Sequence, residues 1–184
     1  VASAQMKSAL LLAGLYASEA VTVEEPAQSR DHTDRMLRAF GHDCRSSDVV
    51  TLRPGEATSE LPEEFEYVVP GDLSGAAFFL MLGLLARRQV TVRGVGLNPT
   101  RTHLLDILRR MGAEIETTAL LVRFGEEVGD LTLHGNRLER LRPFELSAEE
   151  APLVIDELPM LSVLAAFAEG RSSFRGASEL RVKE

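Results

Sequence analysis

Two adjacent carboxylates, Asp156 and Glu157, interrupt a run of apolar residues in the last fifth of the sequence. The pattern predicts a short buried strand over residues 153–155, followed by a helix over about residues 158–169 with Pro159 in its first turn. Asp156 is then a candidate N-cap, which is the more common role of a lone Asp in front of a helix. A carboxylate between a helix end and apolar neighbours can also act as a general base, and the adjacent Glu157 favours this second interpretation.

Three predicted helices, over about residues 4–17, 74–87 and 158–169, are apolar on nearly every face and rich in Ala. The first two contain Gly14 and Gly83, and this composition is typical of buried helices with close neighbours. Polar residues stand at all three starts: Ser3 and Gln5, Asp72 and Ser74, and Asp156 and Glu157. Free N–H groups at a helix start attract anions, so these ends are candidate ligand sites, although Ser3 is also a simple N-cap.

The sequence contains an internal repeat. The strand-like stretch Ala20-Val21-Thr22-Val23 returns roughly 70 positions later as Gln89-Val90-Thr91-Val92. Each copy is followed by an amphipathic helix, over residues 31–40 and 100–111, that ends before a glycine. A related stretch, Ser172-Ser173-Phe174-Arg175-Gly176, follows the third apolar helix. We therefore predict an α/β fold of repeated βαβαββ-type subdomains, each with its apolar helix buried in a shared centre.

Five further stretches predict strands, over residues 44–53, 64–69, 114–124, 130–135 and 141–146. Residues 53–64 are rich in Pro, Gly and charge and predict a loop. The most plausible crossing between two domains lies just beyond this loop, at residues 67–71.

Composition limits the classes of function. The chain has 184 residues, of which 45% are hydrophobic and 26% charged, as expected of a soluble globular protein. A net charge of −8 and few aromatic residues argue against a general nucleic-acid surface. The apolar stretches are shorter than the roughly 20 residues that a membrane span needs, and no signal peptide is visible. Cys44 is the only cysteine, so a cysteine-rich metal site is excluded and a reducing cytoplasm is expected.

Six short motifs stand in order along the chain: Val1-Ala2-Ser3-Ala4-Gln5-Met6-Lys7-Ser8-Ala9, Ser29-Arg30-Asp31-His32-Thr33, Pro70-Gly71-Asp72, Arg101-Thr102-His103-Leu104-Leu105, Ile155-Asp156-Glu157-Leu158-Pro159 and Glu179-Leu180-Arg181-Val182-Lys183-Glu184. Together they resemble the 5-enolpyruvylshikimate-3-phosphate synthase family. The resemblance implies two domains built from six αβ subdomains, an inside-out α/β barrel-like arrangement with the active site between the domains. It also implies transfer of the enolpyruvyl group of phosphoenolpyruvate to the 5-hydroxyl of shikimate 3-phosphate, with release of phosphate, in the shikimate pathway of aromatic amino-acid biosynthesis.

The resemblance assigns roles to single residues. Contacts with shikimate 3-phosphate fall on Ser3, Gln5, Asp156 and Lys183, and Arg30 matches a phosphate-contact position in one branch of the family. Gln5 would also face phosphoenolpyruvate. Asp156 matches the acid that handles the proton of the 5-hydroxyl, and Glu184 matches a second catalytic carboxylate near the enolpyruvyl carbon. His32 and His103 are interpreted as surface or cap residues, without a ligand role.

The resemblance further implies an enzyme without metal or organic cofactor, located in the cytoplasm and monomeric when complete, with no nucleic-acid or membrane partner. Residues 1–66 would form the last subdomain of one domain, and residues 67–184 the first subdomains of the other. The sequence departs from the family pattern at Gly75 and His103, where no chemistry is expected. The chain starts and stops inside family motifs and lacks several of the family's cations, so we expect a fragment that is inactive by itself.

Two alternatives stay open at this point. A UDP-N-acetylglucosamine enolpyruvyl transferase would share the fold and the chemistry. A non-catalytic ligand-binding module would share the fold alone.

Overall fold

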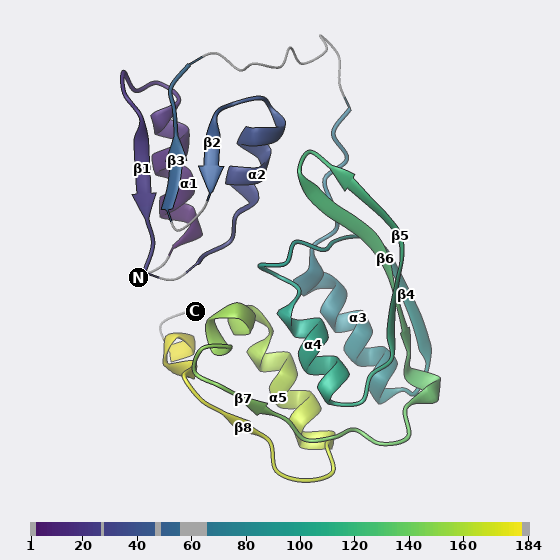
Figure 1. Ribbon diagram of the computed structural model, residues 1–184. Coiled ribbons are helices and arrows are strands. Elements are labelled where there is room, and N and C mark those ends of the chain that lie inside the picture. Colours follow the sequence, from purple (N-terminus) through teal and green to yellow (C-terminus); the bar gives the residue numbers. More distant parts are fainter. Residues whose placement is uncertain (1–2, 27, 47–48, 56–65, 182–184) are drawn as a thin grey trace. The chain divides into compact units, whose positions relative to one another are not determined.

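The computed structural model describes residues 3–26, 28–46, 49–55 and 66–181. The chain forms two compact units, one made of Val1–Val69 with Val122–Glu127 and the other of Pro70–Leu121 with Val128–Glu184 (Figure 1). Each unit has its own apolar core, which is the usual mark of a separately packed body.

The first unit contains two helices and a three-stranded sheet. Its elements are α1 (Ala4–Gly14), β1 (Val21–Glu24), α2 (His32–Ala39), β2 (Cys44–Ser46) and β3 (Val49–Leu52). The strand order is β1-β3-β2, and both pairs are antiparallel. α1 packs against β1 and α2 against β2, and Leu11, Leu37 and Leu52 fill the core between helices and sheet.

The elements that follow along the chain begin in the same order. They are α3 (Leu73–Leu85), β4 (Gln89–Gly96), α4 (His103–Arg110), β5 (Ile115–Arg123) and β6 (Glu126–His134), with strand order β4-β6-β5. The third strand of each set therefore lies in the middle of its sheet. Both sets are mixed α/β structure, so the predicted fold class is confirmed at this level.

The remainder of the chain adds a smaller layer to the second unit. It comprises η1 (Gly135–Arg137), β7 (Glu145–Leu146), η2 (Ala151–Glu157), α5 (Leu158–Phe167), β8 (Ser173–Phe174) and η3 (Ala177–Arg181). β7 and β8 pair in parallel, and α5 packs against α3. α4 packs against η2, so α3, α4 and α5 converge on one core.

The apolar helices are buried on one side rather than all round. α3 approaches its sheet so closely at Gly83 that an added Cβ would lie 2.8 Å from Leu133 Cδ2 and 2.9 Å from Val90 Cγ2, which requires glycine there. The other side of α3 exposes Phe78 and Phe79, which are 63% and 59% accessible. α1 and α5 likewise expose large apolar side chains, namely Met6, Leu10, Leu12, Val163 and Phe167.

Three predictions of local structure are wrong. Residues 153–155 lie in the 3-10 helix η2 and not in a strand. The cause is a capping box in front of η2, because Ser147 N–H donates to Glu150 Oε2 at 2.9 Å and Glu150 N–H donates to Ser147 Oγ at 3.3 Å. The predicted strand over 44–53 is the antiparallel pair β2 and β3, and the described part of the predicted strand over 64–69 contains no strand.

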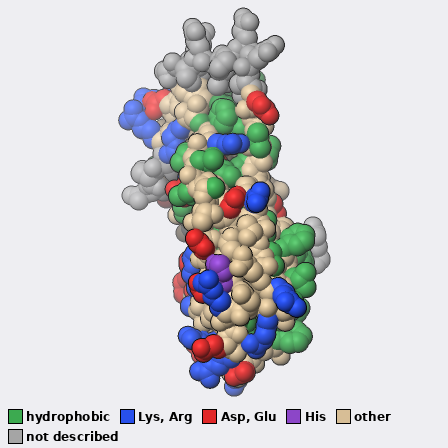
Figure 2. All heavy atoms as spheres, turned by 90° about the vertical axis from the view of Figure 1, so that its right-hand side faces the viewer, with side chains coloured by type: hydrophobic (Ala, Val, Ile, Leu, Met, Phe, Trp, Pro, Cys, Tyr) green, Lys and Arg blue, Asp and Glu red, His purple; other side chains and the backbone are tan. Residues whose placement is uncertain are grey.

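The surface mixes charges of both signs. Figure 2 shows blue and red side chains interspersed over the face that it displays, with green hydrophobic side chains among them. In the part of the chain that the structure describes, no helix is long and apolar enough to cross a membrane.

Candidate functional site

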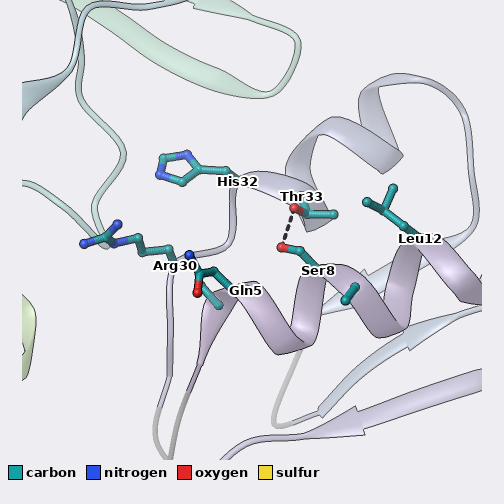
Figure 3. A pocket seen from close by; sticks show the side chains of 8 residues that line it. Gln5, Ser8, Leu12, Arg30, His32 and Thr33 are labelled. Carbon is teal, nitrogen blue, oxygen red and sulfur yellow. Dashed lines mark hydrogen bonds between the residues drawn. The ribbon is translucent and has the colours of Figure 1, made fainter. Parts of the chain in front are cut away.

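A pocket of about 470 Å³ lies beside α1 in the first unit. It is lined by Ala4, Gln5, Ser8, Ala9, Leu12, Arg30, His32 and Thr33. Figure 3 shows Gln5 and Arg30 at one end of the pocket and Leu12 at the other. The hydroxyls of Ser8 and Thr33 are 2.7 Å apart and join α1 to the first turn of α2. The pocket thus offers an amide, a guanidinium and hydroxyl groups beside an apolar wall, a combination suited to a small, polar, anionic ligand.

The helix start next to this pocket is built by Ser3. Its hydroxyl accepts a hydrogen bond from Met6 N at 3.4 Å, so Ser3 is the N-cap of α1, as its position predicted. Gln5 follows in the first turn of the helix and is exposed. Arg30 is partly buried in the segment that leads into α2. Two of the predicted site residues, Gln5 and Arg30, therefore meet at one pocket, and Ser3 shapes the adjacent helix end.

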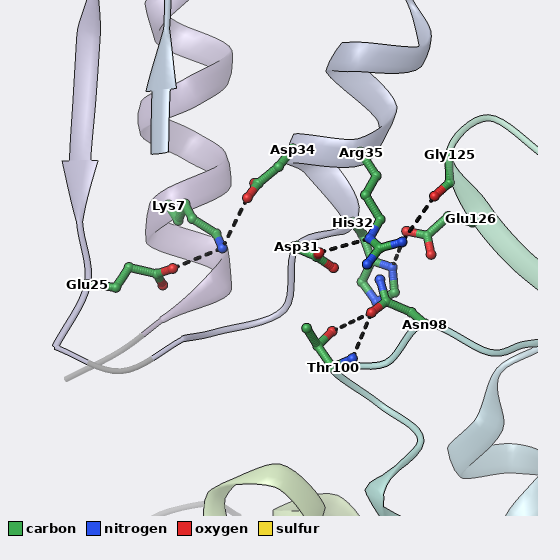
Figure 4. Close-up of polar contacts among 10 residues, drawn as sticks. All are labelled: Lys7, Glu25, Asp31, His32, Asp34, Arg35, Asn98, Thr100, Gly125 and Glu126. Atoms are coloured by element: carbon green, nitrogen blue, oxygen red, sulfur yellow. Dashed lines mark hydrogen bonds and ion pairs between the residues drawn. The ribbon is translucent and has the colours of Figure 1, made fainter. Parts of the chain in front are cut away.

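Lys7, one turn along α1, is a buried cation that the sequence analysis missed. Its side chain is 2% exposed, and Nζ lies 3.0 Å from Glu25 Oε2 and 3.5 Å from Asp34 Oδ2 (Figure 4). Burial raises the pKa of the Asp34 carboxyl, although the charge of Lys7 opposes the shift. For Glu25 burial would also raise the pKa, but hydrogen bonds from Ser29 and Lys7 outweigh it and lower the pKa. Lys7 is fully engaged by these carboxylates, which favours a structural role.

In the second unit Arg101 lies among three carboxylates. Its Nη1 is 3.4 Å from Asp156 Oδ2, and its Nη2 is 3.5 Å from Glu157 Oε1 and 3.9 Å from Asp72 Oδ1. The Arg101 side chain is 11% exposed, that of Glu157 is 2% exposed and that of Asp156 is 28% exposed. A planar guanidinium suits this position because its several donors can serve different acceptors at fixed angles.

Ser74 completes the cluster. Its hydroxyl donates to Glu157 Oε1 at 2.5 Å and accepts from Arg101 Nη2 at 2.5 Å. Ser74 is the second residue of α3, whose N-cap Asp72 accepts hydrogen bonds from the backbone N–H groups of Ser74 and Gly75 at 3.2 Å each. The start of α3 thus places the Ser74 hydroxyl between the side chains of Arg101 and Glu157.

The interpretation of Asp156 as an N-cap is wrong. The residue at the N-cap position of α5 is Glu157, whose side chain makes no capping hydrogen bond. The chain reaches α5 from η2, which is already helical, so the first N–H groups of α5 do not follow an extended segment in the way that a capping Asp requires. The Asp156 carboxylate is directed to Arg101 instead.

Arg101 was part of a family motif in the sequence but received no role. It lies in a turn before α4, where Asn98 Oδ1 accepts hydrogen bonds from Thr100 N at 2.8 Å and from Thr100 Oγ1 at 2.7 Å (Figure 4). A cation beside a helix N-terminus is electrostatically unfavourable unless anions compensate it. This mismatch is the signal in the sequence that could have pointed to carboxylates around Arg101.

The two remaining predicted site residues, Lys183 and Glu184, lie outside the described residues. His103, which was given no ligand role, is partly buried, and its Nε2 lies 3.1 Å from Glu150 Oε1. Among the residues that the structure describes, no three His, Cys, Asp or Glu side chains gather in a way that could hold a metal ion.

Comparison with known proteins gives one consistent result. The family model described as EPSP synthase (3-phosphoshikimate 1-carboxyvinyltransferase) matches residues 1–184. The chain is 50% identical over 190 residues to the 3-phosphoshikimate 1-carboxyvinyltransferase of Parasynechococcus marenigrum (strain WH8102) and 48% identical over 186 residues to that of Syntrophotalea carbinolica. The matches cover 100% of this chain but only 41% and 42% of those relatives.

Solved structures agree. The chain matches an EPSP synthase structure from Acinetobacter baumannii with a TM-score of 0.84 and 40% sequence identity, covering 100% of this chain and 40% of that one. At this identity the likeness extends to sequence as well as fold. The match of the family model along all 184 residues shows that the chain belongs to the EPSP synthase family, the 3-phosphoshikimate 1-carboxyvinyltransferases.

Proposed function

We propose that the longer protein to which this chain corresponds transfers the enolpyruvyl group of phosphoenolpyruvate to the 5-hydroxyl of shikimate 3-phosphate and releases phosphate. The observation that carries the proposal is the pocket of about 470 Å³ where Gln5 and Arg30 meet. Both residues stand at positions that the family resemblance assigns to ligand contacts. The match of the family model along residues 1–184 supports the same reaction.

The chemistry of the pocket fits the phosphorylated substrate. The guanidinium of Arg30 can form paired, charge-assisted hydrogen bonds with a phosphate group. The amide of Gln5 can donate a hydrogen bond to a phosphate oxygen and accept one from a hydroxyl. This suits a ring that carries a phosphate group and hydroxyl groups. Ser3 holds the first turn of α1 in register, so that the side chain of Gln5 is presented from a fixed backbone.

The acid and base of the reaction would come from carboxylates elsewhere in the chain. Addition of the 5-hydroxyl across the double bond of phosphoenolpyruvate, an enol phosphate, needs a group that removes the hydroxyl proton and a group that protonates the methylene carbon. Loss of a proton from the resulting methyl group with departure of phosphate then restores the double bond. We assign the first role to Asp156, which is ionisable, partly exposed and held near a guanidinium. We assign the second to Glu184, with Lys183 as a further cation for the shikimate phosphate.

The 184 residues correspond to only part of the related enzymes, which affects the activity expected of the chain by itself. The chain spans about 41% of the length of the relatives it matches. Both substrates must be held together for the reaction, so we expect the 184 residues alone to have no measurable turnover. We assign residues 1–66 to one domain and residues 67–184 to the other, and we expect the complete enzyme to be a cytoplasmic monomer.

The exposed apolar sides of α1, α3 and α5 support the finer fold proposal. Phe78, Phe79 and Leu82 are more than half exposed on α3, and Met6 on α1. Several large apolar side chains exposed on one helix face usually mark an interface. In the six-subdomain arrangement these sides would be covered by the parts of the longer protein that the chain lacks.

The proposal is tested at Arg30 in a full-length enzyme that contains these 184 residues. Arg30→Ala should weaken binding of shikimate 3-phosphate by about 1.5–3 kcal/mol, because hydrogen bonds to a charged group are lost, and should leave phosphoenolpyruvate binding nearly unchanged. Titration calorimetry with each substrate measures both effects. Arg45→Ala is the matched control, because Arg45 pairs with Asp43 on the exposed surface. Equal weakening for both substrates, or none for either, would contradict the proposed site.

A further inference from the structure

Arg101 has a geometry that the proposed reaction does not yet explain. We propose that Arg101 is a positioning residue, which holds the Asp156 carboxylate for proton removal and is itself held by Ser74 and Glu157. This inference rests on the proposed function, because it concerns the residue that we assign as the base. It adds two residues, Arg101 and Ser74, that do not touch the reacting atoms in this assignment.

The two terminal nitrogens of Arg101 serve different partners. Nη1 faces Asp156 Oδ2 at 3.4 Å, whereas Nη2 faces Ser74 Oγ at 2.5 Å and Glu157 Oε1 at 3.5 Å. Because the guanidinium is planar and rigid, fixing one of these nitrogens also fixes the other. A partner of Nη2 therefore controls where Nη1, and with it Asp156, can lie.

The partners of Nη2 form a firm anchor. Glu157 is buried, and within the described part of the chain its Oε2 has no hydrogen-bond partner. A buried carboxylate of this kind is costly unless a positive charge compensates it, and Arg101 Nη2, 3.5 Å from Oε1, supplies that charge. Ser74 bridges the two side chains from the first turn of α3, whose backbone is fixed by its Asp72 cap.

The backbone that carries Arg101 is fixed as well. Asn98 is 1% exposed, and its side chain closes a turn with Thr100. The backbone N–H of Arg101 donates to Asn98 O at 2.8 Å within the same turn. Anchored at both its backbone and its Nη2, the Arg101 side chain has little freedom to swing away from Asp156.

Asp156 itself stands at the junction between η2 and α5, and its side chain is 28% exposed. A base works only within a narrow range of distances and angles to the proton that it accepts. The guanidinium of Arg101, whose Nη1 lies 3.4 Å from Asp156 Oδ2, is rigid and restricts the positions that this partly exposed carboxylate can take.

The test compares variants of a full-length enzyme that contains these 184 residues. Arg101→Gln should lower kcat by roughly 10–100-fold through misplacement of the base, with a much smaller change in KM for shikimate 3-phosphate. Arg101→Lys should recover only part of this loss, because an ammonium cannot bridge both sets of partners. Arg109→Gln is the control, since Arg109 pairs with Asp106 on the exposed side of α4 and should keep normal kinetics.

Asp156→Asn separates the inference from the function on which it rests. If Asp156→Asn abolishes turnover while Arg101→Gln keeps normal kcat, the inference alone is overturned. If Asp156→Asn keeps normal turnover, Asp156 is not the base, and both the assigned role and the inference fall. A loss of kcat in both variants supports the role of Asp156 as the base and the role of Arg101 in positioning it.

A second readout does not depend on activity. The observable is the carboxyl ¹³C resonance of Asp156 in the 184-residue chain, which is identified by its disappearance in Asp156→Asn. This resonance should shift in Arg101→Gln and in Ser74→Ala. It should keep its position in Arg109→Gln. If Arg101→Gln does not fold, Ser74→Ala carries the test, because it removes only the bridging hydroxyl. An Asp156 resonance that is unchanged in the folded variants would overturn the inference.

Discussion

Each unit of the chain places one cation among carboxylates near a helix start, but the two clusters differ in access to solvent. In the first unit Lys7 is 2% exposed, and its partner Asp34 is 1% exposed. In the second unit Arg101 connects the buried Glu157 to Asp156, whose side chain is 28% exposed. The first cluster is closed, whereas the second leads from the interior to the surface. A closed cluster can only stabilise its unit, and an open one can also hold a reactive group.

The choice of cation follows from this difference. The ammonium of Lys7 is a compact point charge on a flexible stem, which suits two carboxylates on either side of it. The guanidinium of Arg101 extends its donors in a plane, which suits one buried partner and one partly exposed partner. Burial leaves a mark on the closed cluster, because it raises the pKa of Asp34 and, together with the charge of Asp34, the pKa of the neighbouring Cys44 thiol.

The largest expected effect lies in the open cluster and concerns rate. In a full-length enzyme that contains this chain, Asp156→Asn should lower kcat by roughly 10²–10⁴-fold, because the amide keeps the shape of the side chain but cannot accept the proton. The melting temperature should change little, since Asp156 is partly exposed and does not occupy the N-cap position of α5. Steady-state kinetics and thermal melting of the same preparation measure the two quantities. A lower melting temperature with near-normal kcat would reverse the comparison and make Asp156 structural.

The next effect lies in the closed cluster and concerns stability. Lys7→Met should lower the free energy of unfolding of the chain by about 3–5 kcal/mol, because the buried Asp34 and the partly buried Glu25 lose their cation. Urea unfolding followed by circular dichroism measures the change. Asp34→Asn added to Lys7→Met is the informative control, since it removes one unpaired charge and should restore part of the stability. A cost close to zero for Lys7→Met would show that the cluster is open to water after all.

The smallest effect is a dependence on pH. Burial raises the pKa of Asp34 above its ordinary value of 3.8, so the folded chain binds this proton more tightly than the unfolded chain does. The stabilisation is therefore fully present below about pH 3.8 and is lost as the pH rises through the raised pKa of the folded chain. Asp34→Asn should lose less stability than the wild type over that window, as measured by urea unfolding at a series of pH values. Asp106→Asn, on the exposed surface, should follow the wild type; identical curves for Asp34→Asn and wild type would contradict the assignment.

Much of the local structure could be predicted from sequence patterns. The amphipathic helices that became α2 and α4 were placed within a few residues, because their apolar residues recur with helical spacing and each is followed by a glycine. The strand over 153–155 was predicted wrongly because three apolar residues carry no periodicity that separates a strand from a helical turn. The Ser147–Glu150 capping box was the better signal, and it precedes the apolar run by only a few residues.

Part of the candidate site could likewise be predicted from the sequence, and part could not. Gln5, Arg30 and Asp156 were selected from motifs that stand in order along the chain, and the structure brings Gln5 and Arg30 to one pocket. Lys7 was overlooked inside an apolar helix, where a single cation should have raised the question of its counter-ions. Ser74 and Arg101 are 27 positions apart, and Arg101 and Asp156 are 55 positions apart. No spacing rule within a helix or strand connects such positions.

The sequence by itself determined the family, the mixed α/β class and the residue types at the helix starts, because motifs and periodicity are properties of neighbouring positions. Only the tertiary structure decided what the charged groups do. Asp156 became a partner of Arg101 and not a cap, because α3, α4 and η2 converge on one core and bring their ends together. The balance of charges in such a cluster depends on distance and burial, which a folded chain sets between residues that are remote in sequence.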